Sequence, residues 1–419
     1  GVDTSDHEVN LKILLSGPLR RGELDAAARD ALLTKMTDDV AALVLDDNYE
    51  QTKALSVSQS RGTKDLDAQA RFMRDLERRG KLDRAVEFLP TDEELRKRGQ
   101  EGKGLTRPEL AVLLAYAKLD LDAEIQASDL PDDPYFEATL ANYFPKAVVE
   151  RFPDALAQHR LRREIISTVL ANRIVNLAGP VFIHRVKEIS SAPAARVARA
   201  FVIAEGAFDL EALNARIDGL DKKVHADVQT TMYASVAELL RRLGLWFLVN
   251  VPANAGIGET VARYRKGVDS LRGTYSSLVS PYEMDDTVGR IKEMVEAGVP
   301  EDIADDVAAL SLWSTAPEIV QLANTRSLDV DLVAGAYFAI GAIVGIDRLR
   351  GLAQRISANE HWDRLAIRRI IDDLFAGQRS LTAQVLTGFE NDKIDRTRAE
   401  GSQAADDWAE AHADALART

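Results

Sequence analysis

The sequence predicts an all-α fold, a multi-helix bundle that can divide into two packed sub-bundles, with negligible β structure. Apolar residues recur at helical spacing along most of the chain, whereas alternating β-branched runs between turn residues are scarce. The length of 419 residues exceeds the usual range of one domain. We therefore expect one large or two smaller helical domains.

The strongest helix signal begins at Thr106. Thr106 and Glu109 have the spacing of a capping box, and Pro108 falls in the first turn, where its missing N–H costs little. The apolar stripe that follows consists of Leu110, Leu113, Leu114, Ala117 and Leu121. This spacing predicts an amphipathic helix with one buried face.

Further helices are expected on both sides of Gly179-Pro180. The pair interrupts a helical pattern over residues 154–189, and we expect a break or kink there. Another helix should run from Val236 through Phe247. Later helices are predicted at residues 291–296, 301–312, 317–322, 332–352 and 362–386.

Composition excludes several kinds of site. The chain has no cysteine, which excludes disulfides, zinc–thiolate sites and thiol nucleophiles. The formal net charge of −14 disfavours nucleic acid as a partner. The longest apolar run, residues 332–346, is shorter than the roughly 20 residues that a membrane span needs. We therefore expect neither a nucleic acid nor a membrane as a partner.

The first eight residues contain a second capping-box spacing, with Glu8 three positions after Ser5. Gly1 and Ser5 would then surround a helix N-terminus, which favours an anion such as a carboxylate. Ser5, His7 and Glu8 also include nucleophile, base and acid types. Their side chains would not share one helix face, so we expect no catalytic triad.

Two further patterns are interpreted as structural. Residues 254–258 resemble a dinucleotide-binding loop, but Val261 stands where the third glycine should be, and the preceding apolar stretch continues a helical face. We interpret the pattern as a loop after a helix. The histidines are scattered without metal-ligand spacing, so we expect no metal site, and His184 is interpreted as structural.

The opening Gly1-Val2-x-x-Ser5-x-x-Glu8 resembles a segment near the end of the catalytic domain of glutamate dehydrogenases. The likeness to the C-terminal helical region of the large bacterial NAD-specific class of that family extends over nearly the whole chain. It is strongest at residues 105–116. It also covers residues 9–15, 47–51, 179–180, 336–341 and 373–379.

The resemblance implies that the chain is the C-terminal helical portion of an NAD-specific glutamate dehydrogenase. Such an enzyme oxidises L-glutamate to 2-oxoglutarate and ammonium with NAD. By the same resemblance, Ser5 helps to bind the substrate's side-chain carboxylate, and Gly1 and Val2 line the same pocket. The catalytic residues and the NAD site would lie in an upstream catalytic domain. This chain alone would then be inactive and would contain no catalytic residue.

The resemblance and the turn-rich stretches at residues 190–193 and 252–258 together suggest the expected domain limits. Residues 1–20 would be the end of the catalytic dehydrogenase domain, and residues 21–190 and 191–390 two helical sub-domains. Residues 391–419 would form an exposed C-terminal helix or tail. A homo-oligomer in the cytoplasm is expected. The helices would then support the catalytic domain or subunit assembly.

The alternative hypothesis is a non-enzymatic helical interaction or regulatory module. An exposed apolar patch would support docking under either hypothesis. The two hypotheses differ at residues 1–15. As the end of a severed catalytic domain, this stretch should lie poorly supported at the surface, with Ser5 facing half a pocket. In an independent module it should pack as an ordinary N-terminal helix.

Overall fold

The computed structural model describes residues 2–272, 281–356, 361–387 and 398–411. Helices dominate these residues, and no strand occurs among them, which confirms the predicted all-α class. The chain divides into two compact units. Unit 1 comprises residues 1–203 and 247–258, and unit 2 comprises residues 204–246 and 259–419. The domain limits proposed from the sequence stay predictions.

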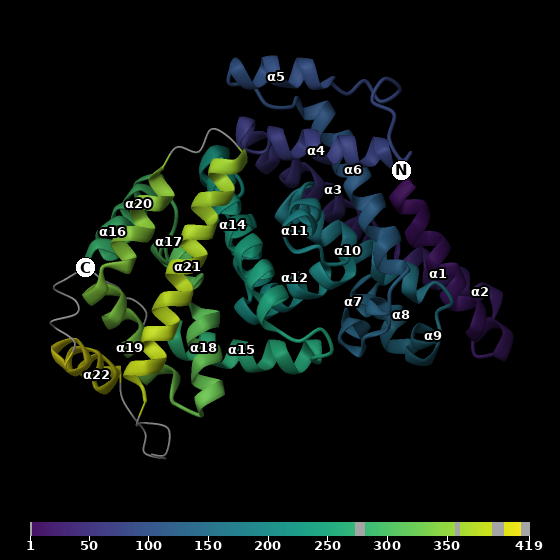
Figure 1. Cartoon of the computed structure of the whole chain (residues 1–419). Helices are drawn as coiled ribbons and strands as arrows, with labels where there is room; N and C mark the ends of the chain where they lie inside the picture. Colours follow the sequence, from purple (N-terminus) through teal and green to yellow (C-terminus); the bar gives the residue numbers. More distant parts are fainter. Residues whose placement is uncertain (1, 273–280, 357–360, 388–397, 412–419) are drawn as a thin grey trace. The chain divides into compact units, whose positions relative to one another are not determined.

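Unit 1 is a layered set of helices in which α6 packs against both α10 and α3 (Figure 1). Its first helices are α1 (Val2–Arg21), α2 (Ala26–Lys35), α3 (Thr37–Ser60), η1 (Gly62–Lys64), α4 (Leu66–Arg78), α5 (Asp92–Gln100) and α6 (Arg107–Gln126). Then come η2 (Leu130–Asp132), η3 (Pro134–Phe136), α7 (Glu137–Asn142), α8 (Lys146–Arg151), α9 (Pro153–Ala157), α10 (Arg162–Ala178) and α11 (Phe182–Ser190).

The predicted helix after Thr106 is confirmed as α6. The Glu109 carboxylate accepts a hydrogen bond from the Thr106 backbone N–H at 2.7 Å, as a capping box requires. All five residues of the predicted stripe are buried. The amphipathic pattern therefore places α6 in the core of unit 1.

The predicted break at Gly179 is also confirmed. Gly179 has φ of +91°, which glycine adopts without the Cβ clash of other residues, and α10 ends there. α11 continues at 89° to α10. In the described part of the chain, no single helix is both long and apolar enough to cross a membrane, and α10 with α11 meets that criterion only as a bent pair.

Three helices contribute residues to both units: α12 (Ala194–Phe208), α14 (Ala226–Asn250) and α15 (Ile257–Arg272). The other helices of unit 2 are α13 (Leu210–Asp218), α16 (Pro281–Glu296), α17 (Glu301–Trp313), α18 (Ala316–Arg326), α19 (Val330–Val344), α20 (Ile346–Arg355), α21 (His361–Val385) and α22 (Arg398–Ala411).

Unit 2 is built around α19, which packs against α18, α21 and α22 (Figure 1). Tyr337 of α19 is fully buried and donates its hydroxyl to the buried Glu318 carboxylate at 3.2 Å. The Tyr337 carbonyl accepts a hydrogen bond from Gln378 of α21 at 2.8 Å. These bonds supply polar partners inside an apolar core, where unpaired groups would be costly.

The single helix predicted over residues 332–352 was wrong. Gly345 has φ of +73° and divides the segment into α19 and α20. A glycine in this left-handed conformation ends α19, and its N–H bonds back to the Gly341 and Ala342 carbonyls.

Helix α22 lies against α19 at very close range. A Cβ atom at Gly401 would overlap the Leu332 carbonyl oxygen, and Ala405 is completely buried. The two backbones can approach this closely because small residues leave room between them. Packing at this point therefore depends on the absence of a side chain.

Candidate functional site

The residues with a proposed substrate role lie at the start of α1. Gly1 is outside the described residues, and Val2 is the first residue of α1. Ser5 is one helical turn further along and is exposed to solvent. The side chain of Val2 is outside the described set, so only Ser5 has a described placement here.

The predicted capping role of Ser5 was wrong. α1 begins at Val2, so Ser5 lies inside the helix instead of at its N-terminal boundary. Glu8 pairs along the helix with Lys12, with Oε1 and Nζ 2.5 Å apart. An S-x-x-E spacing fits the interior of a helix as well as its start, and the packing of α1 decided between them.

Poor support of residues 1–15, which was expected if this stretch is the end of a severed catalytic domain, was wrong for its described residues 2–15. They pack as the ordinary N-terminal helix that the alternative hypothesis expected. Leu11, Leu14 and Leu15 are at most 2% exposed. α1 packs against α3 and α9, so one apolar face is covered while Ser5 faces outward. The covered face therefore holds α1 in place, and the exposed face with Ser5 is open to solvent.

His7 is the central polar residue on the covered face of α1. Its side chain is only 2% exposed, and its ring stacks on Tyr143 with centroids 4.3 Å apart and planes 18° from parallel. Within the described residues neither ring nitrogen has a hydrogen-bond partner, and the nearest carboxylate oxygen, from Asp47, is 3.9 Å away. Stacking on Tyr143 is therefore its main specific contact.

Asn10 lies one turn after His7 and adds two hydrogen bonds. Its side-chain Nδ2 donates to the Tyr143 hydroxyl at 2.9 Å, and its carbonyl accepts from His159 Nε2 at 3.1 Å. His159 Nδ1 in turn accepts from the Leu161 N–H at 3.2 Å, which fixes the tautomer. We call His7, Asn10, Tyr143 and His159 the α1 clasp.

Burial keeps the α1 clasp neutral at His159. The ring is 5% exposed, and desolvation lowers the pKa of His159 below its ordinary value, against the effect of its bond to Asn10. A neutral imidazole can donate from one nitrogen and accept at the other, which is the pattern found. The His159 ring is thus a fixed structural contact within the clasp.

The arrangement excludes a triad of Ser5, His7 and Glu8. Ser5 and Glu8 are exposed, whereas His7 is buried on the covered face. Proton transfer from the Ser5 hydroxyl would require the imidazole within hydrogen-bond reach. The prediction from helix geometry is therefore confirmed.

Residues 254–256 lie in the loop between α14 and α15, and Ile257 and Gly258 begin α15, so the pattern follows a helix and not a strand. α14 runs without interruption through the apolar stretch that might have been a strand. The Rossmann-type phosphate site needs a strand before its glycine turn and a helix directly after it. The interpretation as a loop after a helix is confirmed, and these residues do not fit NAD.

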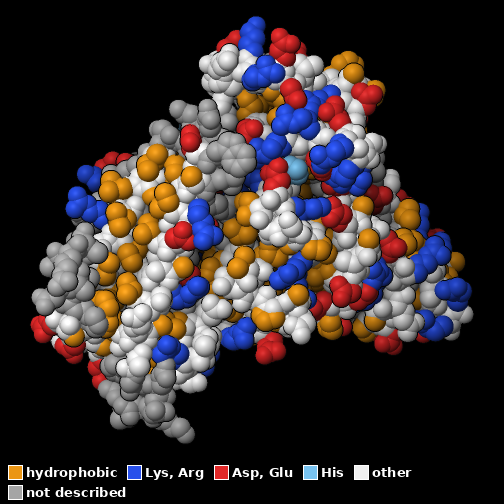
Figure 2. Space-filling model, in the orientation of Figure 1, with side chains coloured by type: hydrophobic (Ala, Val, Ile, Leu, Met, Phe, Trp, Pro, Cys, Tyr) orange, Lys and Arg blue, Asp and Glu red, His pale blue; other side chains and the backbone are white. Residues whose placement is uncertain are grey.

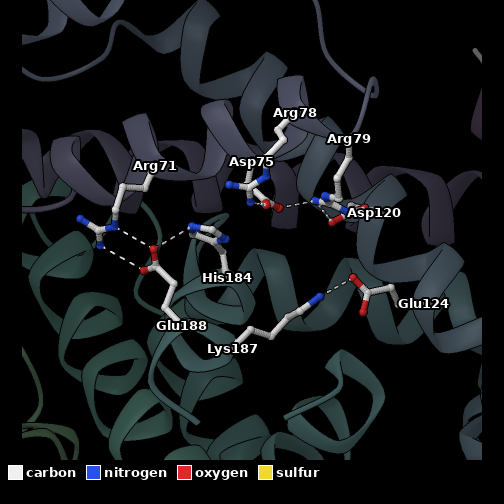
Figure 3. A network of polar contacts seen from close by, with 9 residues as sticks. All are labelled: Arg71, Asp75, Arg78, Arg79, Asp120, Glu124, His184, Lys187 and Glu188. Atoms are coloured by element: carbon white, nitrogen blue, oxygen red, sulfur yellow. Dashed lines mark hydrogen bonds and ion pairs between the residues drawn. The ribbon is translucent and has the colours of Figure 1, made fainter. Parts of the chain in front are cut away.

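A second polar group in unit 1 joins α4, α6 and α11 (Figure 3). Arg71 Nε donates to Glu188 at 2.8 Å, and His184 Nε2 lies 3.3 Å from the same carboxylate. Lys187 of α11 reaches Glu124 of α6 at 2.6 Å. The bonds of Arg71 and Lys187 each join two helices, whereas His184 and Glu188 both lie on α11. The His184 ring also lies 5.3 Å from the ring of Phe72 of α4, which suits a structural role for His184.

Asp120 of α6 binds two cations at the end of α4. Its carboxylate accepts from Arg79 at 2.7 and 2.8 Å and from Lys81 at 2.5 Å. Burial alone would raise the pKa of Asp120, but the bonds from Arg79 and Lys81 outweigh burial and hold it below its ordinary range. Among the described residues, no group of three or more acidic or histidine side chains is placed to hold a metal ion.

Exposed apolar side chains lie on unit 2. Figure 2 shows apolar side chains gathered over the part of unit 2 that carries α16 and α20. Val288 and Val295 of α16 and Leu349 and Leu352 of α20 are each more than 40% exposed. Contiguous exposed apolar surface is typical of contact surfaces.

Sequence reasoning missed the α1 clasp entirely. Asn10 and Tyr143 are 133 residues apart, and Asn10 and His159 are 149 residues apart. No local spacing could have joined them. The only available signal was a histidine and an asparagine on the face of α1 that also carries its buried leucines.

Comparisons with known proteins agree across the chain. Residues 102–419 match the family model "Glutamate dehydrogenase, C-terminal", and residues 1–58 match "Bacterial NAD-glutamate dehydrogenase, catalytic domain". Proteins named NAD-specific glutamate dehydrogenase are 41% identical in Pseudomonas aeruginosa, 37% in Halomonas elongata and 32% in Mycobacterium tuberculosis. Each match covers 92% of this chain and 24% of the relative, so the chain spans about a quarter of their length.

Proposed function

The chain belongs to the family of glutamate dehydrogenase C-terminal regions, and from this membership we propose that it is the C-terminal part of an NAD-dependent glutamate dehydrogenase. The whole enzyme would convert L-glutamate to 2-oxoglutarate and ammonium, with NAD as hydride acceptor. The names of the three relatives support this reaction. The match of residues 1–58 to a catalytic-domain model supports a direct junction with the catalytic part.

The role proposed for the helices is to hold the end of the catalytic segment in place. The observation that carries this role is the α1 clasp. His7 and Asn10 belong to the segment that matches the catalytic domain, whereas Tyr143 and His159 belong to the segment that matches the C-terminal region. A helix fixed in this way would present Ser5 to a substrate carboxylate in a constant position.

In this proposal, the redox reaction takes place in a part of the enzyme outside the 419 residues of this chain. The glycine-containing segment at residues 254–258 does not fit NAD, because it follows helix α14 and not a strand. When bound by the whole enzyme, NAD would accept the hydride. The part of this chain would be to orient α1 and to support assembly. A homo-oligomer and a cytoplasmic location belong to the same proposal, to be tested by light scattering and cell fractionation.

The first test compares the full polypeptide with this chain. Glutamate-dependent reduction of NAD, followed by absorbance, is expected for the full polypeptide and not for the 419-residue chain at equal molar concentration. Turnover by the isolated chain would refute the division of roles. Failure of the full polypeptide to oxidise glutamate would refute the reaction itself and favour a non-enzymatic interaction module.

The second test addresses the bracing role in the full polypeptide. Tyr143→Ala should lower kcat/KM for glutamate by about tenfold or more, because small displacements of a substrate-binding element are costly. Lys146→Ala, an exposed change on the neighbouring α8, is the matched control and should leave activity unchanged. Equal activity of both variants and wild type would refute bracing but not the reaction.

A further inference from the structure

Unit 2 contains a cavity of about 110 Å³ where α12 ends and α13 begins. Its floor is apolar and consists of Phe208, Leu210, Leu213, Leu239 and Leu310, all at most 8% exposed. Trp313 of α17 and Ala212 of α13 also line the cavity, and Ala212 is exposed. The lining comes from separate helices and surrounds a space that can accept a small apolar group.

The turn beside the cavity is held in an uncommon conformation. Asp209 has φ of +52° and ψ of +41°, a left-handed backbone that non-glycine residues seldom adopt. Arg265 fixes this turn, because Nε and Nη2 donate to the Gly206 carbonyl at 2.9 and 2.6 Å and Nη2 reaches the Asp209 carboxylate at 3.1 Å. Residues held in such conformations occur preferentially at binding sites.

The charges around the cavity are unequally compensated. Asp209 pairs with Arg265, and Asp306 pairs with Arg216, which also binds Asp302 at 2.8 Å. Both carboxylates of the lining, Asp209 and Asp306, therefore already have an arginine partner, so the lining does not favour a cationic ligand.

Arg272 is the cation of the lining with the weakest partner. Its Nη2 donates to the Phe208 carbonyl at 2.8 Å. Within the described residues its nearest carboxylate, from Asp269, is 3.9 Å away. The guanidinium lies 6.0 Å from the centre of the Trp313 ring. An arginine so placed has further N–H groups to offer an anion.

We propose that this cavity binds a small monocarboxylate with a compact apolar body. The carboxylate pairs with Arg272, and the apolar body lies on the leucine floor beside Trp313. The volume equals that of roughly four water molecules, which suits a body of about four to six non-hydrogen atoms. This site is independent of the reaction proposed above.

The test uses three probes of nearly the same shape with the 419-residue chain. They are isovalerate, its neutral amide and the corresponding amine, isopentylamine, each titrated by calorimetry and by ligand-detected NMR. Isovalerate should bind at least about tenfold more tightly than the amide, and the amine should not bind, because a carboxylate forms charge-assisted bonds with a guanidinium.

Substitutions test the charge of Arg272 and the volume of the cavity separately. Arg272→Gln should weaken isovalerate binding about tenfold, whereas Arg272→Lys, which retains the charge, should weaken it only a few-fold. Ala212→Trp should fill the cavity and abolish binding. Ala215→Trp is the matched control, since Ala215 is exposed on the same helix and does not line the cavity.

Unfolding midpoints of all variants establish that they are folded. Equal binding of acid and amide, preference for the amine, or undiminished binding by Ala212→Trp would each overturn the proposal. Lack of binding by isovalerate up to about 10 mM would also overturn it, because even a Kd near 1 mM gives saturation there.

Discussion

The ring of His7 lies stacked on the ring of Tyr143, with centroids 4.3 Å apart. This contact joins the segment matched by the catalytic-domain model to the segment matched by the C-terminal model. Asn10 strengthens the connection by its bond to the Tyr143 hydroxyl. Removing the ring and removing only the hydroxyl should therefore have graded effects on α1.

We expect Tyr143→Phe to cost about 1 kcal/mol, the usual net value of one hydrogen bond. Tyr143→Ala should cost about 3 kcal/mol, because it also leaves a cavity against His7. Urea unfolding measures both values. Hydrogen exchange should show that the amides of α1 lose protection in Tyr143→Ala.

The matched control for the hydroxyl is Tyr116→Phe. Tyr116 donates its hydroxyl to Glu87 at 2.7 Å, and this bond lies outside the α1 clasp. Tyr116→Phe should lower the free energy of unfolding by a similar amount, but the amide hydrogens of α1 should not exchange faster. If α1 exchanges equally fast in all three variants, the clasp does not hold the helix.

Ser5→Ala in the full polypeptide tests the substrate role implied by the family resemblance. Ser5 is exposed on the face of α1 opposite His7. A lost hydrogen bond to a carboxylate should raise the KM for glutamate about tenfold, with kcat within about twofold. Steady-state kinetics give both constants. Thr4→Ala, also exposed, should change neither, and an identical KM in the two variants would exclude Ser5 from the site.

Asp120→Asn should show a pH-dependent loss of stability. The bonds from Arg79 and Lys81 hold the pKa of Asp120 below its ordinary value of 3.8. The carboxylate therefore stabilises the fold fully above that value, and the stabilisation disappears as the pH falls through the lower pKa of the folded state. Near pH 7 we expect a cost of about 2 kcal/mol, reduced for partial exposure of the cations.

Urea unfolding at several pH values checks this expectation for Asp120. The difference between wild type and Asp120→Asn should shrink below about pH 4. Glu8→Gln is the control, because its pair with Lys12 is more than half exposed on both sides and should contribute little. A difference that stays constant with pH would show that charge is not the cause.

Two glycines with open space around them should respond to alanine in opposite directions. Nothing lies within 4 Å of a Cβ built at Gly345 or at Gly377. Gly345 has φ of +73°, so Gly345→Ala should destabilise unit 2 by about 1 kcal/mol. Gly377 lies inside α21, so Gly377→Ala should stabilise it by about 0.5–1 kcal/mol.

Thermal unfolding measures both glycine variants, and Gly345→Asn serves as a second control. Asparagine tolerates the left-handed conformation better than alanine and should cost less. Stabilisation by Gly345→Ala would mean that α19 and α20 can join into the single helix that the sequence predicted.

Local signals sufficed for much of the fold. The residues that cap and fill α6 are neighbours in sequence, so Thr106, Glu109 and the leucine stripe predict it without tertiary information. Gly345 shows the limit of such signals. A glycine within an apolar run is compatible with a continuous helix and with a break, and only packing selects the backbone conformation.

The candidate site was less predictable than the fold. Ser5 was singled out by resemblance, but its assumed capping position depended on a spacing that helix interiors share. The α1 clasp and the cavity near Asp209 arise from residues on separate helices. Their distances in space have no counterpart in local sequence spacing, so no pattern could reveal them.

The contact at Gly401 limits which mutations the C-terminal helix can accept. Every other amino acid at position 401 brings at least one side-chain carbon atom, and that atom would overlap the Leu332 carbonyl oxygen. Even alanine, the mildest replacement, would thus push α22 from α19. Among natural variants of this chain, position 401 should therefore remain glycine, whereas exposed neighbours such as Gln403 should vary.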